Sequence, residues 1–139
     1  MEAPIDVING SFAYIISKDP AAILSTYHES EELYVILEGP RLSNRGYGPI
    51  SKGWQDFCAS PIALQQVDWL EGPFVEETAA MSWVGGIIRL TVEVNERIVA
   101  PVFRASFVLT LQNGRWKIKH EHVSAAHEDP YGIGDWLQK

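Results

Sequence analysis

The sequence predicts an α+β domain in which three N-terminal helices pack over the concave face of a curved antiparallel sheet. Three observations support this fold class. Apolar residues recur with helical spacing before about residue 60 and with strand-like patterns after it. A strong hairpin signal, Asn113-Gly114, lies between two long apolar runs. Paired glycines, Gly85-Gly86, lie within a predicted strand, where glycine usually marks a bulge that bends the sheet.

The N-terminal part of the chain predicts the three helices. Spacings of three and four place one apolar stripe on a helix over residues 4–16, formed by Ile5, Ile8, Phe12, Ile15 and Ile16. A second, short helix is predicted to start at Asp19-Pro20, because aspartate caps exposed amides and proline suits the first helical position. We expect the third helix over residues 52–59, with Ser51 as its cap.

The remaining segments predict strands. The β-branched and aromatic residues at 32–38 favour a buried strand, and the loop at residues 39–49 has room for a short paired strand near 45–47. Long strands are predicted at residues 62–71, 74–94, 99–112 and 115–124, with turns at Gly72-Pro73, Asn95-Glu96 and Asn113-Gly114. We place one domain at residues 4–124 and a C-terminal tail at residues 125–139.

Composition limits the class of protein. The chain has 139 residues, 46% of them hydrophobic and 21% charged, which is ordinary for one globular domain. No apolar run approaches the roughly 20 residues that span a bilayer, and the N-terminus lacks a signal-peptide pattern, so we expect a cytoplasmic protein without a membrane partner. The formal net charge of -7 argues against nucleic acid as a partner. The single cysteine, Cys58, cannot form an internal disulfide.

The C-terminal hairpin predicts a specific register. If Asn113 and Gly114 form a two-residue loop, residues that face each other across the two strands share one side of the sheet. The predicted pairs are Leu111 with Trp116, Leu109 with Ile118, Phe107 with His120, and Ala105 with His122. An apolar face would therefore end in two imidazoles.

The same hairpin resembles a known family. Its second strand combines a glycine, a tryptophan, an aliphatic residue, two alternating histidines and a serine: Gly114, Trp116, Ile118, His120, His122 and Ser124. This pattern resembles the SnoaL-like domains of the nuclear transport factor 2-like superfamily, with looser support from Asp19-Pro20 and Gly53-Trp54. The resemblance covers residues 4–124. It implies a cone-like, cystatin-like α+β roll, a homodimer formed through the sheet, and a largely apolar cavity between sheet and helices.

Three side chains are candidates for proton transfer. His120 and His122 point the same way on their predicted strand, and an imidazole titrates near neutrality. The alternative is that both are buried or dimer-facing residues with structural hydrogen bonds. Asp68 is the carboxylate candidate, because an acid that reaches into an apolar cavity becomes a base with a raised pKa. The two imidazoles would chelate a metal only with a third ligand, which the sequence does not identify, so we expect no metal and no cofactor.

Aromatic residues are the expected walls of the cavity. The predicted lining consists of Tyr14, Tyr27, Trp54, Trp69, Trp83, Phe103, Phe107, His120 and His122. Such a lining favours a flat, apolar or aromatic ligand. For the aromatic residues and histidines alike, the alternative is ordinary packing in the core or at an interface.

These observations predict a homodimeric domain that binds a small, largely apolar molecule in an internal pocket. Because members of the superfamily differ in activity, two other functions stay open. One is a cofactor-free isomerase, cyclase or dehydratase that uses a histidine or a carboxylate as proton carrier. The other is a non-catalytic assembly module.

Overall fold

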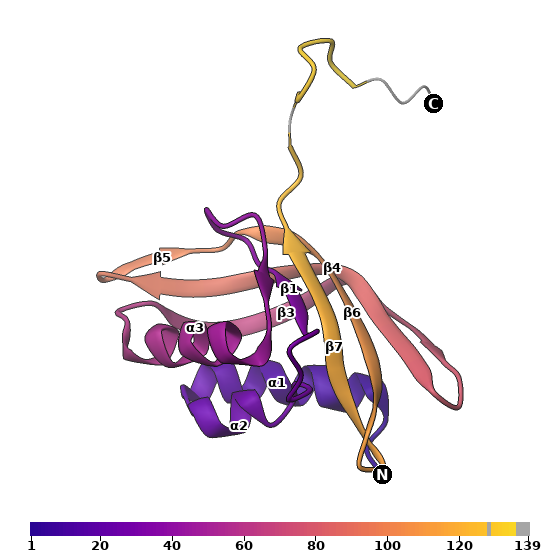
Figure 1. Ribbon diagram of the computed structural model, residues 1–139. Coiled ribbons are helices and arrows are strands. Elements are labelled where there is room, and N and C mark those ends of the chain that lie inside the picture. Colours follow the sequence, from indigo (N-terminus) through magenta and orange to yellow (C-terminus); the bar gives the residue numbers. More distant parts are fainter. Residues whose placement is uncertain (128, 136–139) are drawn as a thin grey trace.

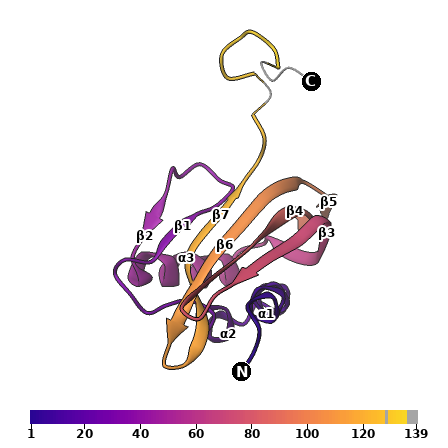
Figure 2. The same cartoon turned by 90° about the vertical axis from the view of Figure 1, so that its right-hand side faces the viewer.

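A computed structural model describes residues 1–127 and 129–135, and within these residues three helices accompany a curved, unclosed sheet of seven strands (Figure 1). The helices precede the long strands along the chain, as the sequence predicts. Figure 2 looks onto the sheet with α3 behind β6 and β7. The predicted fold class, a curved antiparallel sheet with helices over its concave face, is confirmed.

The first two helices begin where the sequence places their caps. Helix α1 spans Pro4–Ser17 and buries Val7 and Ile8. Helix α2 spans Pro20–Leu24, and the Asp19 carboxylate accepts a hydrogen bond from the Ala22 backbone amide at 3.1 Å. Proline occupies an early helical position in both. Both predicted helix starts are confirmed.

The third helix begins earlier than the sequence predicts. Helix α3 spans Tyr47–Ala59, so Ser51 lies inside the helix and is not its cap. The cap is Gly46, whose φ of 93° favours glycine. Backbone hydrogen bonds from Gly46 to Leu33 and from Tyr47 to Ser30 tie this end of the helix to the preceding loop. Because those partners are distant in sequence, local patterns did not reveal the start.

The strands follow one path across the sheet in the order β2-β1-β7-β6-β4-β3, and β5 pairs with β4. Their bounds are β1 Tyr34–Ile36, β2 Asn44–Arg45, β3 Ala63–Glu77, β4 Met81–Val94, β5 Arg97–Val99, β6 Val102–Gln112 and β7 Arg115–Ser124. All pairs are antiparallel except β1 with β7, which is parallel. The predicted strand at residues 99–112 is divided around Pro101, which has no amide hydrogen to donate.

The predicted turn at Gly72-Pro73 is wrong. Strand β3 continues through these residues with a shift in register between Glu71 and Phe74, and the chain reverses only after Glu77. Strand β4 likewise continues through Gly85 and Gly86. The two strands approach closely here: a Cβ on Gly86 would lie only 2.2 Å from the Glu71 carbonyl oxygen, so this position has room only for glycine. A Gly-Pro dipeptide can therefore mark a bulge within a long strand as well as a turn.

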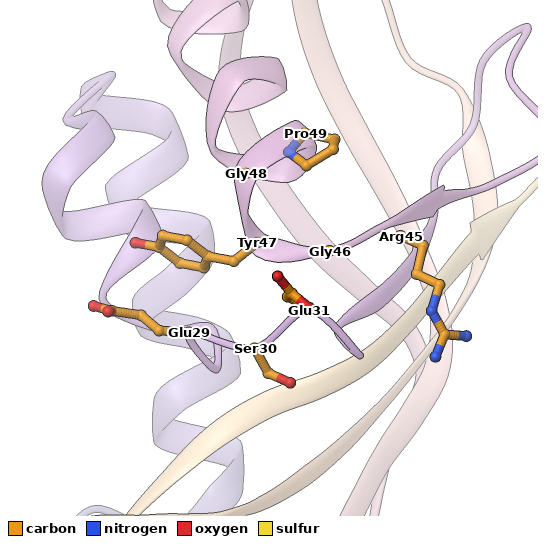
Figure 3. A pocket seen from close by; sticks show the side chains of 8 residues that line it. All are labelled: Glu29, Ser30, Glu31, Arg45, Gly46, Tyr47, Gly48 and Pro49. Atoms are coloured by element: carbon orange, nitrogen blue, oxygen red, sulfur yellow. The ribbon is translucent and has the colours of Figure 1, made fainter.

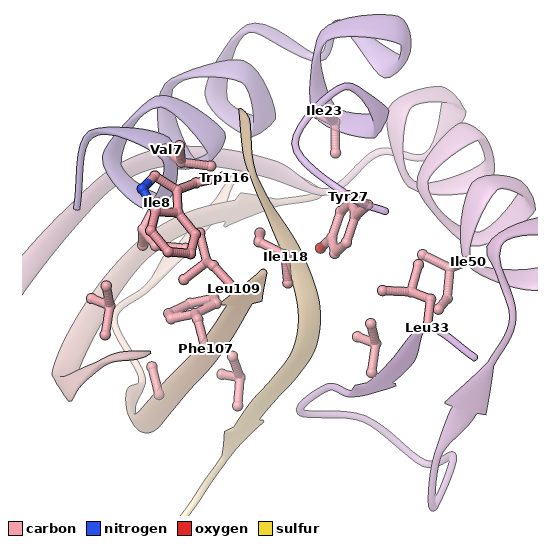
Figure 4. Packing of buried hydrophobic residues seen from close by; sticks show 14 of the residues in the cluster. Val7, Ile8, Ile23, Tyr27, Leu33, Ile50, Phe107, Leu109, Trp116 and Ile118 are labelled. Carbon is pink, nitrogen blue, oxygen red and sulfur yellow. The ribbon is translucent and has the colours of Figure 1, made fainter. Parts of the chain in front are cut away.

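The core lies between the helices and the concave face of the sheet (Figure 4). Helix α1 packs across β3, β4 and β7, and α2 packs between α1 and α3. The fully buried side chains of Ile8, Ile23, Leu109 and Ile118 come from both helices and from the two hairpin strands. None of the helices in the described residues is long and apolar enough to cross a membrane.

The C-terminal segment leads away from the sheet (Figure 1). Tyr131 and Ile133 are exposed, and the Asp129 carboxylate accepts hydrogen bonds from the amides of Ile133 and Gly134. The rest of the predicted tail, residues 136–139, and residue 128 lie outside the described residues. The boundary between domain and tail stays a prediction.

Candidate functional site

A bulge in β7 decides which side chains of this strand face the core. Asn113 and Gly114 have positive φ, and the predicted pairs Leu111 with Trp116 and Leu109 with Ile118 are confirmed. The next pair is Val108 with His120, so Lys119 is an extra residue on β7. Beyond the bulge, Glu121 pairs with Phe107 and Val123 pairs with Ala105. The predicted pairing of Phe107 with His120 and of Ala105 with His122 is therefore wrong, and Glu121 takes the inward position.

Glu121 lies at the end of a chain of two hydrogen bonds inside the core. The Tyr27 hydroxyl donates to Glu121 Oε1 at 2.6 Å, and Trp54 Nε1 donates to the Tyr27 hydroxyl oxygen at 3.2 Å. Only 6% of Glu121 and 2% of Tyr27 are exposed. The three residues come from β7, from the segment after α2, and from α3. They form a chain of donors that ends on a buried carboxyl group.

Local backbone pairing holds Tyr27 in this position. The segment after α2 runs alongside β7, where the Ile118 amide donates to the Thr26 carbonyl at 2.8 Å and the His28 amide donates to the Ile118 carbonyl at 3.0 Å. Tyr27 therefore lies between two backbone hydrogen bonds to the strand that carries Glu121. Trp54 lies on the side of α3 that faces this segment, as its bond to Tyr27 requires.

Burial makes Glu121 a weak acid. Removal from water raises its pKa to about 7, the Tyr27 hydrogen bond opposes this rise, and the nearby charge of Glu38 adds to it. Burial and the Glu121 carboxylate raise the pKa of Tyr27 well above its usual value, so the phenol keeps its proton. Glu38 is exposed in part, yet partial removal of its carboxyl group from water also raises its pKa. Near neutral pH, a carboxyl that can gain or lose a proton thus faces a hydroxyl that stays protonated.

The two predicted histidines lie on the other side of β7. His120 pairs with Val108, its Nδ1 donates to the Tyr34 carbonyl at 2.9 Å, and its ring stacks on Tyr34 with 5.5 Å between ring centroids. His122 pairs with Ser106. The buried imidazole is instead His28, whose Nε2 lies 2.6 Å from the Thr110 hydroxyl. Catalysis or ligand binding by His120 and His122 stays a prediction.

Asp68 is not part of the hydrogen-bonded group formed by Glu121, Tyr27 and Trp54. Its carboxylate accepts two hydrogen bonds from Gln66 Nε2, both at 2.9 Å, on strand β3. The neighbouring Trp69 alternates to the concave face, where its indole donates to Asn9 Oδ1 at 3.1 Å and its ring contacts Phe12. A catalytic role for Asp68 stays a prediction.

The structure brings together part of the predicted lining. Tyr27, Trp54 and Phe107 meet around Glu121, while Phe103 and Trp69 pack against the edge of the core. Tyr14 and Trp83 lie elsewhere, and 39% and 44% of these side chains are exposed. The predicted aromatic wall is therefore divided between the core, the α1 surface and the outer face of the sheet.

The sequence contained a signal for the inward position of Glu121, which counting residue pairs from the Asn113-Gly114 turn missed. Trp116 and Ile118 are buried, and the next apolar residue of the strand is Val123. An odd interval of five residues separates Ile118 from Val123, so strict alternation cannot place both on one face. One extra residue between them resolves the conflict, and it moves Glu121 inward and His120 outward.

A hollow of about 640 Å³ lies at the surface where α3 begins (Figure 3). Its lining consists of Glu29, Ser30, Glu31, Arg45, Gly46, Tyr47, Gly48 and Pro49. The Arg45 guanidinium points away from Tyr47 and Glu29 in Figure 3. No group of three or more His, Cys, Asp or Glu side chains within residues 1–127 and 129–135 is arranged to hold a metal ion.

Comparisons with known proteins agree with the fold. A family model described as "SnoaL-like domain" matches residues 5–128. No curated protein matches the chain at a significant level. A nuclear transport factor 2-like superfamily protein from Salmonella enterica serovar Typhimurium aligns with a TM-score of 0.75 at 19% identity, covering 94% of this chain and 93% of that chain.

Two further solved structures carry functional names. A ketosteroid isomerase-like protein from Erwinia carotovora atroseptica aligns with a TM-score of 0.69 at 14% identity, covering 86% of this chain and 91% of that chain. A candidate calcium/calmodulin-dependent protein kinase type II association domain from Thiobacillus denitrificans aligns with a TM-score of 0.72 at 12% identity, covering 91% of this chain and 98% of that chain. At such identities the likeness shows the fold alone.

Proposed function

This chain belongs to the SnoaL-like domain family, and on that premise we propose that it binds a small, largely apolar molecule next to Glu121. The observation that carries the proposal is the buried carboxyl of Glu121, hydrogen-bonded by Tyr27, which is itself hydrogen-bonded by Trp54. A buried ionisable group lowers the stability of the fold unless it is fully compensated. Such groups therefore often mark binding or catalytic sites.

We infer that a ligand would approach Glu121 between α3 and the sheet. Apolar side chains on both sides are only partly buried against the core: Trp54 and Cys58 on α3, and Val67, Leu90 and Phe103 on β3, β4 and β6. These side chains provide an apolar surface around a single polar group. This combination fits a molecule with a hydrophobic body and one hydroxyl or carbonyl oxygen.

The protonation state of Glu121 decides which polar group it binds best. The ionised carboxylate accepts a hydrogen bond from a hydroxyl, whereas the protonated form also donates to a carbonyl. Because the pKa of Glu121 is about 7, the affinity for a hydroxylated ligand rises as the pH increases through neutrality.

Titration with 2-naphthol, a planar hydroxylated aromatic, tests the proposal by calorimetry. We expect saturable binding that weakens about tenfold in Glu121→Gln and Tyr27→Phe, because each loses one hydrogen-bonding group. The control Glu77→Gln removes an exposed carboxylate at the end of β3 and should bind like the unmodified protein. Equal affinity in the unmodified protein and all three variants would show that the ligand does not bind next to Glu121.

A second candidate function is proton transfer without a cofactor, as in an isomerase, cyclase or dehydratase. It is favoured by one observation: Glu121 titrates near neutrality beside Tyr27, whose phenol stays protonated. The carboxylate would remove a proton from a carbon next to a carbonyl group, and the Tyr27 hydroxyl would turn to donate to the enolate oxygen. The same carboxyl would return the proton to a different carbon.

The same samples separate binding from catalysis. Exchange of the protons next to the carbonyl of 2-tetralone in heavy water, followed by NMR, reports the proton-transfer step. An enzyme would accelerate exchange with a rate that rises through about pH 7, and Glu121→Gln would lower it by about two to four orders of magnitude. Binding without accelerated exchange would leave the ligand-binding function alone.

We further propose that a second copy of the chain is the partner of the sheet. Across four strands the outer face carries a row formed by Trp83, Val108, His120 and Tyr34. Trp83 and Tyr34 are 44% and 37% exposed. The adjacent row of the sheet faces the core instead, since its members Val84, Phe107 and Glu121 are all buried. An exposed aromatic row on a sheet face favours association with another apolar surface.

A further inference from the structure

The outer face of the sheet carries two imidazoles whose hydrogen-bonding capacity is only partly used. His120 and His122 are two positions apart on β7, which is about 7 Å along a strand, and both lie on the face away from the core. The Nδ1 atom of His120 donates to the Tyr34 carbonyl at 2.9 Å, so Nε2 of the neutral ring keeps a free lone pair. His122 is half-buried and has no hydrogen-bond partner among the described residues.

The hydrogen bond of His120 is of the kind that orients an imidazole for a metal ion. A metal-binding histidine usually donates its second ring N–H to a carbonyl or carboxylate oxygen, which fixes both the tautomer and the direction of the ring. His120 makes this bond to the neighbouring strand β1, and its ring is held by stacking on Tyr34 with an angle of 12° between the planes.

One copy of the chain supplies only two ligands. A zinc ion in a protein needs three or four side-chain ligands. Within residues 1–127 and 129–135, no third His, Cys, Asp or Glu side chain completes such a group. The remaining ligands would therefore have to come from a second molecule.

The position of the histidines in the aromatic row indicates a second copy as that molecule. The row runs from Trp83 through Val108 and His120 to Tyr34, so its midpoint lies between Val108 and His120. Two copies that associate through this row about a two-fold axis at its midpoint bring their His120 side chains together. Each His120 is then displaced sideways from its counterpart by about one strand spacing, about 5 Å, across a gap of about 10 Å between the sheets. Imidazoles that reach from both sides can share one ion in this gap.

The surface beside His122 has room for the side chains of a second copy. Its neighbours across the sheet are Ser106 on β6 and, next to Ser106, Gly85 on β4. Both are small, so this part of the outer face is lower than the aromatic row next to it.

The positive side chains around the two histidines are bonded to other acceptors. The Arg104 guanidinium donates to Ser124 Oγ at 3.0 Å and to the Ala125 carbonyl at 2.9 Å. The Lys119 ammonium group donates to Ser30 Oγ at 3.4 Å. These bonds direct both charges to the margins of β7 and leave the imidazole nitrogens available.

We propose that a zinc ion binds between two copies of the chain, held by His120 and His122 of each copy. Four neutral imidazoles provide the nitrogen ligands and the tetrahedral number that zinc prefers, whereas Mg²⁺ and Ca²⁺ prefer oxygen ligands. The ion stabilises the pair of copies, because neither copy alone completes the site. This proposal rests on the proposed association through the outer face and is independent of Glu121, which faces the core.

The test titrates the full-length, untagged and EDTA-treated protein with zinc chloride and measures binding by calorimetry. We expect one zinc ion for every two chains. Sedimentation velocity at a series of protein concentrations measures association with and without zinc. Zinc should lower the concentration at which half of the chains are dimeric by about tenfold or more, because it binds the dimer in preference to the monomer.

Variants of single histidines identify the ligands. His120→Gln and His122→Gln each remove two of the four ligands in the dimer, and each should weaken zinc binding by about a hundredfold or more. This exceeds the loss of about 10–100-fold that follows from removing an outer hydrogen-bond partner of a ligand. The matched control is His127→Gln in the exposed segment after β7, which should bind zinc like the unmodified protein.

The outcomes separate the zinc site from the association on which it rests. A dimer that forms without zinc and binds none would overturn the zinc site and leave the association intact. A protein that is monomeric without zinc and dimeric with it would support the zinc site and overturn the metal-free association. One zinc ion per chain, or unchanged affinity in both His120→Gln and His122→Gln, would overturn the shared site.

Discussion

At the scale of single residues, Glu121 is the most informative side chain of the protein. It occupies a core position that pairs with Phe107, where an apolar residue would avoid the desolvation of a carboxyl group. The hydrogen bond from Tyr27 compensates only part of this cost, because the net effect on the pKa of Glu121 is a rise to about 7. This cost to stability is the physical basis of the proposed role of Glu121 in binding or proton transfer.

The raised pKa predicts how stability depends on pH. The folded protein keeps the Glu121 proton up to about pH 7, whereas an exposed glutamate has a pKa near 4.5. Stabilisation from the protonated carboxyl is therefore complete below about pH 4.5 and is lost as the pH rises to about 7, amounting to about 3 kcal/mol at 1.36 kcal/mol per pH unit. Glutamine in its place has no such dependence.

Urea denaturation of the two proteins measures this effect. The free energy of unfolding of the unmodified protein, relative to Glu121→Gln, should fall by about 3 kcal/mol between about pH 4.5 and about pH 8. Glu77→Gln serves as the control, since that side chain is exposed. Parallel pH profiles for the unmodified protein and Glu121→Gln would contradict the raised pKa.

At the scale of secondary structure, the close approach of β3 and β4 fixes the residue type at Gly86. A Cβ there would meet the Glu71 carbonyl oxygen at 2.2 Å and the Trp69 ring at 3.0 Å. Both strands are long and paired on each side of this point, so relief requires moving the backbone of the sheet. The bulge in β3 and the glycine in β4 therefore depend on each other.

Substitution of two glycines tests this dependence. Gly86→Ala should lower the free energy of unfolding by about 2 kcal/mol or more, in the range measured for overpacked cores. The control Gly53→Ala lies within α3, where a Cβ meets no atom within 4 Å, and should raise stability by up to about 1 kcal/mol. Thermal or urea unfolding reports both values, and a neutral Gly86→Ala would show that the strands separate easily.

At the scale of the whole molecule, the helices cover one face of the sheet and leave the aromatic row of the other face exposed. If a second copy covers this row, sedimentation velocity at micromolar concentration should show a dimer. Trp83→Glu should shift the protein to a monomer, because it replaces the large exposed aromatic side chain at the β4 end of this row with a charge. Leu42→Glu is the control, since Leu42 is 94% exposed in the loop before β2. A monomeric unmodified protein would contradict the association through this face.

Local chemistry was sufficient for several elements. The Asp19-Pro20 cap, the stripe of α1 and the Asn113-Gly114 turn depend on neighbours within a few residues, and each was predicted at the right place. Contacts between distant segments were not predictable in this way. The start of α3 depends on backbone bonds to the loop at residues 30–33, and the course of β3 through Gly72-Pro73 depends on its pairing with β4.

By itself, then, the sequence determined the α+β class, the order of helices and strands, and the hairpin, because these follow from periodicity and turn chemistry along the chain. The family was indicated by the resemblance of the residue pattern on the last strand to SnoaL-like domains. Pairing with β6 in the tertiary structure decided where along β7 the alternation of faces reverses. One extra residue at Lys119 reverses the alternation, so that Glu121 joins Tyr27 and Trp54 while His120 stacks on Tyr34 on the other face. A bulge forms only against a partner strand, so its position is set by pairing rather than by local preference.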